Sequence, residues 1–171
     1  MNLLNEFLDV DDIRNKYDML NFKFEPESQE SYNDLTHNYG SRTDIKILLQ
    51  PDSFQRRDAY FNIECKRLDG HKDLNDKYID NGVKRFISSK YSSYYGKNFM
   101  IGFVVKNIKI DDNTAKIEEL KNSSEDERLH GKFELVYSDN NIVHEYICKY
   151  CLLKEEIDLS HIFYNFSNVI K

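Results

Sequence analysis

The order of hydrophobic and polar positions along the chain predicts a mixture of helices and strands. Apolar side chains recur at roughly helical spacing through residues 1–20 and again, without an intervening proline, over 74–95. Residues 111–120 begin with an Asp-Asp-Asn-Thr start signal and continue as a short amphipathic helix. The polar stretch 27–39 is followed by a glycine, so it predicts one more helix.

Runs of β-branched and aromatic residues predict the strands. Residues 43–49 and 59–65 are two such runs, and a segment with a proline and an aspartate separates them, which suits a turn between antiparallel neighbours. The continuous apolar run 100–105 is typical of a strand buried on both faces. The remaining segments are an expected hairpin over 133–137 and 143–150, and a tail, 159–170, read as strand followed by helix.

This order predicts an α/β (α+β) domain in which helices flank a central mixed β-sheet. The 171 residues are enough for one domain with one substantial core, so we expect a single domain over 1–171. The composition supports a globular chain, with 40% hydrophobic and 32% charged residues and two prolines.

The ends and the cysteines suggest where the protein works. No apolar run approaches the roughly 18 residues of a membrane span, and the N-terminus lacks a basic start followed by an apolar run. Three cysteines are an odd number, which argues against a disulfide scaffold. We therefore expect a cytoplasmic protein without a membrane partner.

The charge distribution is uneven and leaves room for a nucleic-acid partner. The chain carries a net charge of −6, but residues 56–97 hold ten Lys/Arg against six Asp/Glu. Because binding responds to the local field, a basic middle in an acidic body can contact phosphates. The alternative is a solvated, lysine-rich helix face.

Candidate chemistry lies on the two predicted antiparallel strands. Side chains alternate along a strand, so Glu64 and Lys66 share one face, while Phe61, Ile63 and Cys65 share the opposite, apolar face, which we expect to belong to the core. If the strands pair, Asp44 can converge with Glu64. Two converging carboxylates in a partly buried site need a cation, and hard oxygen ligands favour Mg²⁺ or Mn²⁺.

The pattern Asp44, nineteen residues, then Glu64-Cys65-Lys66 resembles the PD-(D/E)XK nucleases, the restriction-endonuclease-like superfamily. The predicted order agrees: a strand with the Asp, a strand with Glu-x-Lys, a long helix and an apolar strand. The resemblance covers about residues 27–105, leaving N-terminal helices and a C-terminal hairpin as additions, and it is nearest to small bacterial members associated with phage defence. The proline that the family has before the Asp is Thr43 here.

The resemblance implies a Mg²⁺-dependent endonuclease that hydrolyses phosphodiester bonds, with DNA as the expected substrate and RNA as the alternative. Asp44 and Glu64 would hold the metal with help from the Cys65 carbonyl, and Lys66 would position the attacking water. A glutamate before the Asp strand completes the site in many members; Glu27 and Glu30 are the candidates, and Glu30 is favoured. Cutting both strands would need a homodimer or a partner subunit.

Further residues have a functional and a structural interpretation. Lys84 and Arg85 follow on the long helix and are candidate phosphate contacts, or solvent-facing charges. Tyr78 and Phe86 are expected in the core. Four possible zinc ligands are present, but the Cys-x-x-Cys spacing would need a turn that the sequence does not predict, so buried thiols are favoured; the four are His144, Cys148, Cys151 and His161.

Two rivals to the nuclease remain open. One is a catalytically silent nuclease fold that serves as a nucleic-acid- or protein-binding subunit, and the other is an acidic interaction module in which Glu-x-Lys is incidental. In the second case Glu64 and Lys66 form a solvated ion pair, which contributes under roughly 1 kcal/mol to stability. A titration with Mn²⁺ distinguishes these alternatives, because two converging carboxylates should bind the ion and scattered ones should not.

Overall fold

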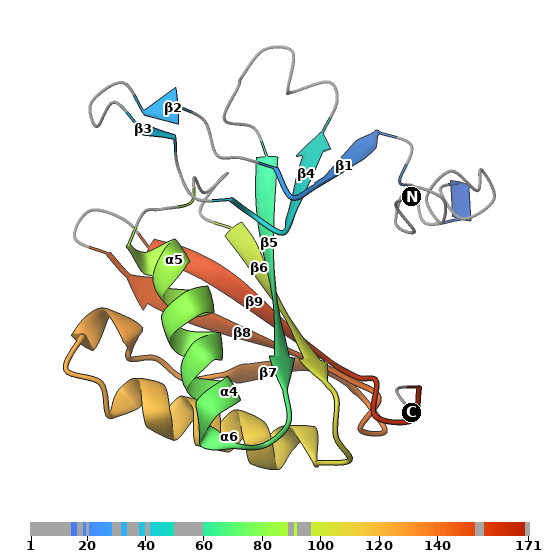
Figure 1. The fold of residues 1–171 in the computed structure, drawn as a ribbon, viewed down its shortest axis with the longest axis vertical. Helices are drawn as coiled ribbons and strands as arrows, with labels where there is room; N and C mark the ends of the chain where they lie inside the picture. The colour runs from blue at the N-terminus through green and yellow to red at the C-terminus, as the bar shows by residue number, and fades with distance from the viewer. Residues whose placement is uncertain are drawn as a thin grey trace.

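A computed structural model describes residues 15–16, 19, 21–28, 32–33, 38–39, 42–49, 60–88, 91, 97–152 and 156–169 (Figure 1). Its strands are β1 (Phe22–Pro26), β2 (Tyr32–Asn33), β3 (Asn38–Tyr39), β4 (Ile45–Leu49), β5 (Tyr60–Leu68), β6 (Lys97–Val104), β7 (Glu134–Asp139), β8 (Val143–Cys151) and β9 (Glu156–Asn165). Its helical segments are α4 (Lys72–Tyr78), η1 (Ile79–Val83), α5 (Lys84–Ile87), α6 (Ile110–Asn122) and η2 (Glu127–Leu129).

Seven strands form one mixed sheet in the order β1-β4-β5-β6-β9-β8-β7, and β2 pairs with β3 in a separate ladder. The central pairs β5–β6 and β6–β9 are parallel, and the pairs toward either edge are antiparallel. A helical crossover, α4-η1-α5, connects the parallel strands β5 and β6, as parallel pairing requires. The predicted fold class, a mixed sheet with helices, is therefore confirmed.

The helices lie on one face of the sheet, where they cover the hydrophobic core cluster (Figure 1). Strands β6, β8 and β9 alternate between fully buried side chains on this face and partly exposed ones on the other. The cluster joins Leu68 of β5 and Met100 of β6 to apolar side chains of the helices. Tyr78 and Phe86 are in this core, as predicted.

The long predicted helix is present, but it is not uniform and is shorter than expected. The helical segments run without a break from Lys72 to Ile87, with π-helical geometry over Ile79–Val83. Gly82 lies in this π-helical segment against Met100, and a Cβ there would come within 2.5 Å of the Met100 methyl carbon. The missing side chain thus allows the helix to approach β6 closely.

The prediction of a helix over 27–39 is wrong at the positions that the structure describes. Tyr32–Asn33 and Asn38–Tyr39 pair as a short antiparallel ladder, and Glu27 is a turn residue with a positive φ of 47°. The stretch has no apolar stripe, so no helix face could be buried there. Residues 166–169, where a closing helix was predicted, form a turn. Most of the predicted helix over 1–20, and the turn over 50–58, lie outside the described residues.

The expected sidedness of β5 is only partly correct. Ile63 is buried, as expected, but Phe61 and Cys65 are half-buried, and the helices cover the opposite face, which carries Glu64 and Lys66. Alternation alone does not tell which face of a strand meets the helices. A carboxylate tolerates this burial only when it is paired and hydrogen-bonded, and Glu64 is both.

Candidate functional site

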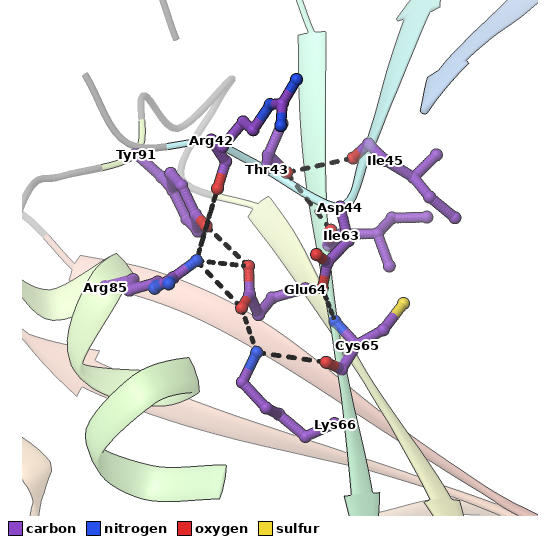
Figure 2. Close-up of polar contacts among 10 residues, drawn as sticks. All are labelled: Arg42, Thr43, Asp44, Ile45, Ile63, Glu64, Cys65, Lys66, Arg85 and Tyr91. Atoms are coloured by element: carbon purple, nitrogen blue, oxygen red, sulfur yellow. Dashed lines mark hydrogen bonds and ion pairs between the residues drawn. The ribbon is translucent and has the colours of Figure 1, made fainter. Parts of the chain in front are cut away.

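The site lies where β4 separates from β5. The last paired residues there are Ile45 and Ile63, and beyond them side chains replace the backbone ladder. The Thr43 hydroxyl lies 3.2 Å from the Ile63 carbonyl, and the Asp44 carboxylate accepts a hydrogen bond of 2.7 Å from the Cys65 N–H (Figure 2). Local polar side chains thus satisfy the backbone groups that the departing strand leaves.

The backbone around Asp44 is anchored on its other side by the end of β1. The Glu27 N–H donates to the Asp44 carbonyl at 2.8 Å, and the Thr43 N–H donates to the Ser28 carbonyl at 2.9 Å. Asp44 is therefore held between β1 and β5 by main-chain and side-chain bonds, so its position does not depend on a bound ion.

Asp44 is held next to the strand position of Glu64. The paired register of β4 and β5 ends at Ile45 and Ile63, and the Asp44 carboxylate then accepts the hydrogen bond from the N–H of Cys65, the residue that follows Glu64. Figure 2 shows both carboxylates beside the same stretch of β5. The two carboxylates that the sequence suggested as a pair thus belong to one polar cluster at the end of the β4–β5 ladder.

Glu64 is completely buried and carries four polar contacts. The terminal nitrogen Nη1 of Arg85 lies 3.0 Å from Oε1 and 3.1 Å from Oε2. The Tyr91 hydroxyl donates to Oε2 at 2.6 Å, and the Lys66 ammonium contacts Oε1. Three elements contribute to this cluster: β5, α5 and the segment that follows α5 (Figure 2).

A second layer of contacts ties the cluster to the chain before β4. The Arg42 carbonyl lies 2.8 Å from the Tyr91 hydroxyl and 3.3 Å from Nη1 of Arg85. Nη1 of Arg85 also donates to the Tyr91 hydroxyl at 2.7 Å. The Lys66 ammonium donates to the Cys65 carbonyl at 3.1 Å, which is the backbone oxygen suggested as a metal ligand.

Burial and charge shift the acid–base behaviour of the neighbouring groups. Burial, reinforced by the charges of Asp44 and Glu64, raises the pKa of the Cys65 thiol to about 12, so this thiol stays protonated. Burial alone would lower the pKa of Arg85, but its hydrogen bond to Tyr91 and the charge of Glu64 outweigh it and raise the pKa. Arg85 is therefore a permanent cation beside Glu64.

Sequence reasoning missed Tyr91 and gave Arg85 a different role. Tyr91 lies in what was predicted to be the end of a long helix, and only the tertiary fold brings its hydroxyl to Glu64. Arg85 was suggested as a phosphate contact, yet in the structure its guanidinium binds Glu64. Lys84 points elsewhere and pairs with Asp80 at 2.7 Å. Glu30 lies outside the described residues, and the side chain of Glu27 pairs with Arg42 at 3.7 Å.

The four suggested zinc ligands are not brought together. Cys148 is buried and Cys151 is exposed, as the alternation of a strand requires. Nδ1 of His161 lies 2.8 Å from the Tyr78 hydroxyl in the core, and Nδ1 of His144 lies 2.7 Å from Asp111. Within the described part of the chain, no group of three or more His, Cys, Asp or Glu side chains could hold a metal ion.

Comparisons with family models, with curated proteins and with solved structures gave no significant match. Among the helices that the structure describes, none has the length and apolar character needed to cross a bilayer.

Proposed function

We propose that the protein is a metal-dependent nuclease of the PD-(D/E)XK type. The observation that carries the proposal is the hydrogen bond from the Cys65 N–H to the Asp44 carboxylate, which holds Asp44 at the residue between Glu64 and Lys66, the pair that lies on one face of β5. The order of elements supports it: a strand that follows the Asp, a strand with Glu-x-Lys, a helical crossover and a parallel apolar strand.

The oxygen donors suit a hard divalent cation. The Asp44 and Glu64 carboxylates and the Cys65 carbonyl are oxygen ligands of the kind that Mg²⁺ and Mn²⁺ prefer. Mg²⁺ is usually held by one or two carboxylates together with substrate phosphate and water, so two side chains are a sufficient protein contribution. When bound, the cation would polarise the phosphate and lower the pKa of a water.

The chain's own residues have distinct parts in this reaction. Lys66, 20% exposed in its side chain, lies close enough to Glu64 to orient a water beside the same carboxylate. Its positive charge offsets the negative charge that develops on the phosphoryl oxygens in the transition state. Hydrolysis adds the hydroxyl of water to phosphorus, and the proton goes to the alkoxide that leaves.

DNA is the proposed substrate and the cytoplasm the proposed location, with RNA as the alternative substrate. A single site cuts one strand, so breaking a duplex would require a second copy or a partner subunit. A role in phage defence or restriction is consistent with a small nuclease domain of this kind.

One observation favours a second candidate, a silent nuclease fold that binds nucleic acid or protein. Glu64 is already neutralised by Arg85 and Lys66, so the buried carboxylate does not need a metal to compensate its charge. In that case the same cluster would serve only to hold α5 against β5.

Cleavage assays decide between these candidates. Supercoiled plasmid, linear duplex and single-stranded RNA are incubated with the protein and Mg²⁺ or Mn²⁺, with EDTA as the metal-free reference. The Lys66→Ala variant should lose about 100-fold or more of the cleavage rate and still bind metal, since it removes a transition-state contact. Arg67→Ala is the matched control, because Arg67 is the next residue on β5, is exposed and faces the opposite side.

Metal-dependent cleavage that Lys66→Ala abolishes and Arg67→Ala retains would support the nuclease. Absence of cleavage on every substrate, with nucleic-acid binding intact, would support the silent fold. Equal cleavage by the parent and Lys66→Ala would contradict the proposed role of the lysine.

A further inference from the structure

Donors surround Glu64 in the structure. Nη1 of Arg85 lies against both carboxylate oxygens, the Tyr91 hydroxyl donates to Oε2 and the Lys66 ammonium contacts Oε1. A divalent cation that binds Glu64 therefore competes with two positively charged side chains. This consequence rests on the nuclease site proposed above.

Arg85 is the donor best placed to leave. The Tyr91 side chain is buried and neutral, and Lys66 is tethered to the same strand as Glu64. Arg85 comes from another element, α5, and its side chain is 33% exposed. As a cation it would also repel an incoming divalent ion, which a neutral hydroxyl would not.

A cavity beside the site gives the guanidinium of Arg85 a second place to bind a phosphate. Arg85 lines a cavity of about 320 Å³ between α5 and η2, together with Lys84 and Arg128. The acidic residues of this cavity are already paired, Asp80 with Lys84 at 2.7 Å and Asp126 with Arg128 at 2.7 Å. A phosphate at the mouth of this cavity would therefore meet the guanidinium of Arg85 with both carboxylates engaged.

We infer that Arg85 is a counter-ion for two groups in succession: it neutralises Glu64 in the free protein and a substrate phosphate in the complex. In the free protein it binds Glu64 and opposes metal binding there. When a phosphodiester arrives, the guanidinium transfers to the phosphate, and Glu64 becomes available to a divalent cation. Arginine is suited to this exchange because its planar fork binds carboxylate and phosphate with similar geometry.

Charge balance gives the exchange its direction. Asp44, Glu64, Lys66 and Arg85 together sum to zero formal charge, so a bare divalent cation would leave the site at +2. A phosphodiester brings one negative charge with it. Metal and nucleic acid should therefore bind cooperatively, and each should raise the affinity of the protein for the other by the same factor.

The test is Mn²⁺ affinity in the absence of nucleic acid, measured by calorimetry on the whole chain. Arg85→Met removes the competing cation and should bind Mn²⁺ about tenfold more tightly than the parent, and the same variant should bind a duplex more weakly. Lys72→Met is the matched control, because Lys72 is a lysine on the preceding helix α4 and pairs with Asp76 rather than with Glu64. Its Mn²⁺ affinity should stay within about twofold of the parent.

Arg85→Gln is the second variant, since its amide can still donate to Glu64 without a charge and so protects folding if Arg85→Met is unstable. Unchanged or weaker Mn²⁺ binding by a folded Arg85 variant would overturn the inference, even if the parent cleaves DNA. Tighter Mn²⁺ binding without any cleavage would instead uphold the inference and contradict the nuclease.

Discussion

The carboxylate of Asp44 accepts a hydrogen bond from the backbone N–H of Cys65, with 2.7 Å between the two atoms. A residue proposed as a metal ligand therefore also closes the end of the β4–β5 ladder. Its structural and chemical contributions are separable, because the oxygen of an amide accepts the hydrogen bond from Cys65 as a carboxylate does but lacks the negative charge that strengthens metal binding.

Asp44→Asn should retain the fold and weaken metal binding. The amide oxygen still accepts from the Cys65 N–H, so unfolding in urea without metal should change by less than about 1 kcal/mol. Asp44→Ala leaves that donor unsatisfied and should cost about 1–3 kcal/mol. Both variants should bind Mn²⁺ more weakly. Equal losses of stability in the two variants would show that the bond to Cys65 contributes nothing.

Tyr91→Phe should destabilise the protein by about 1–2 kcal/mol in urea unfolding. It removes the hydroxyl that lies 2.6 Å from Oε2 of Glu64 and leaves a buried acceptor short of a partner. Tyr137→Phe, at an exposed position on β7, is the control and should stay within about 0.5 kcal/mol of the parent. A Tyr91→Phe variant as stable as the control would indicate that Glu64 does not need this donor.

Stability should fall as the pH is lowered through the range in which histidine titrates. Burial, assisted by the charge of Lys121, lowers the pKa of His161 from 6.5 to about 3. Between these values the unfolded chain binds a proton that the folded chain does not, so the free energy of unfolding decreases by up to about 1.4 kcal/mol for each unit by which the pH falls. His161→Gln should show a correspondingly shallower slope in urea unfolding from pH 6.5 down to 4. A slope as steep as that of the parent would assign the acid sensitivity to other groups.

The salt dependence of nucleic-acid binding tests whether Lys84 and Arg85 of α5 contact phosphates. Replacing Lys84 and Arg85 together by alanine should flatten the slope of log affinity against log salt by about two at most, because each lost phosphate contact releases one counter-ion fewer. Lys72→Ala is the control, since Lys72 lies at the start of α4 and pairs with Asp76. A folded double variant with the slope of the parent would mean that α5 does not contact the nucleic acid.

The sequence was sufficient to predict the strands from β4 onward in outline and the antiparallel pairing of β4 with β5, because β-branched and aromatic runs and a short turn segment report on local structure. It did not predict β1, β2 or β3. The sequence did not show which face of β5 packs against the helices, since both faces carry apolar residues. Only the tertiary fold places Arg85 beside Glu64.

The polar stretch 27–39 was misread because local propensity is weak there and pairing with a neighbouring segment dominates, as Tyr32 opposite Tyr39 shows. Tyr91 was missed for a related reason. It follows Glu64 by 27 residues, and no spacing rule connects a tyrosine after a helix to a carboxylate on a strand.

Strand β6 is paired with β5 on one side and, along its whole length, with β9 on the other. Residues 156–165 therefore belong to the same sheet as the strand that carries Glu64, although they follow it by more than ninety residues. A fragment truncated after β6 would contain every described residue of the site and still expose one full edge of its central strand. Strand β9 is thus part of the scaffold that holds the cluster around Glu64, and a minimal folded fragment would have to include it.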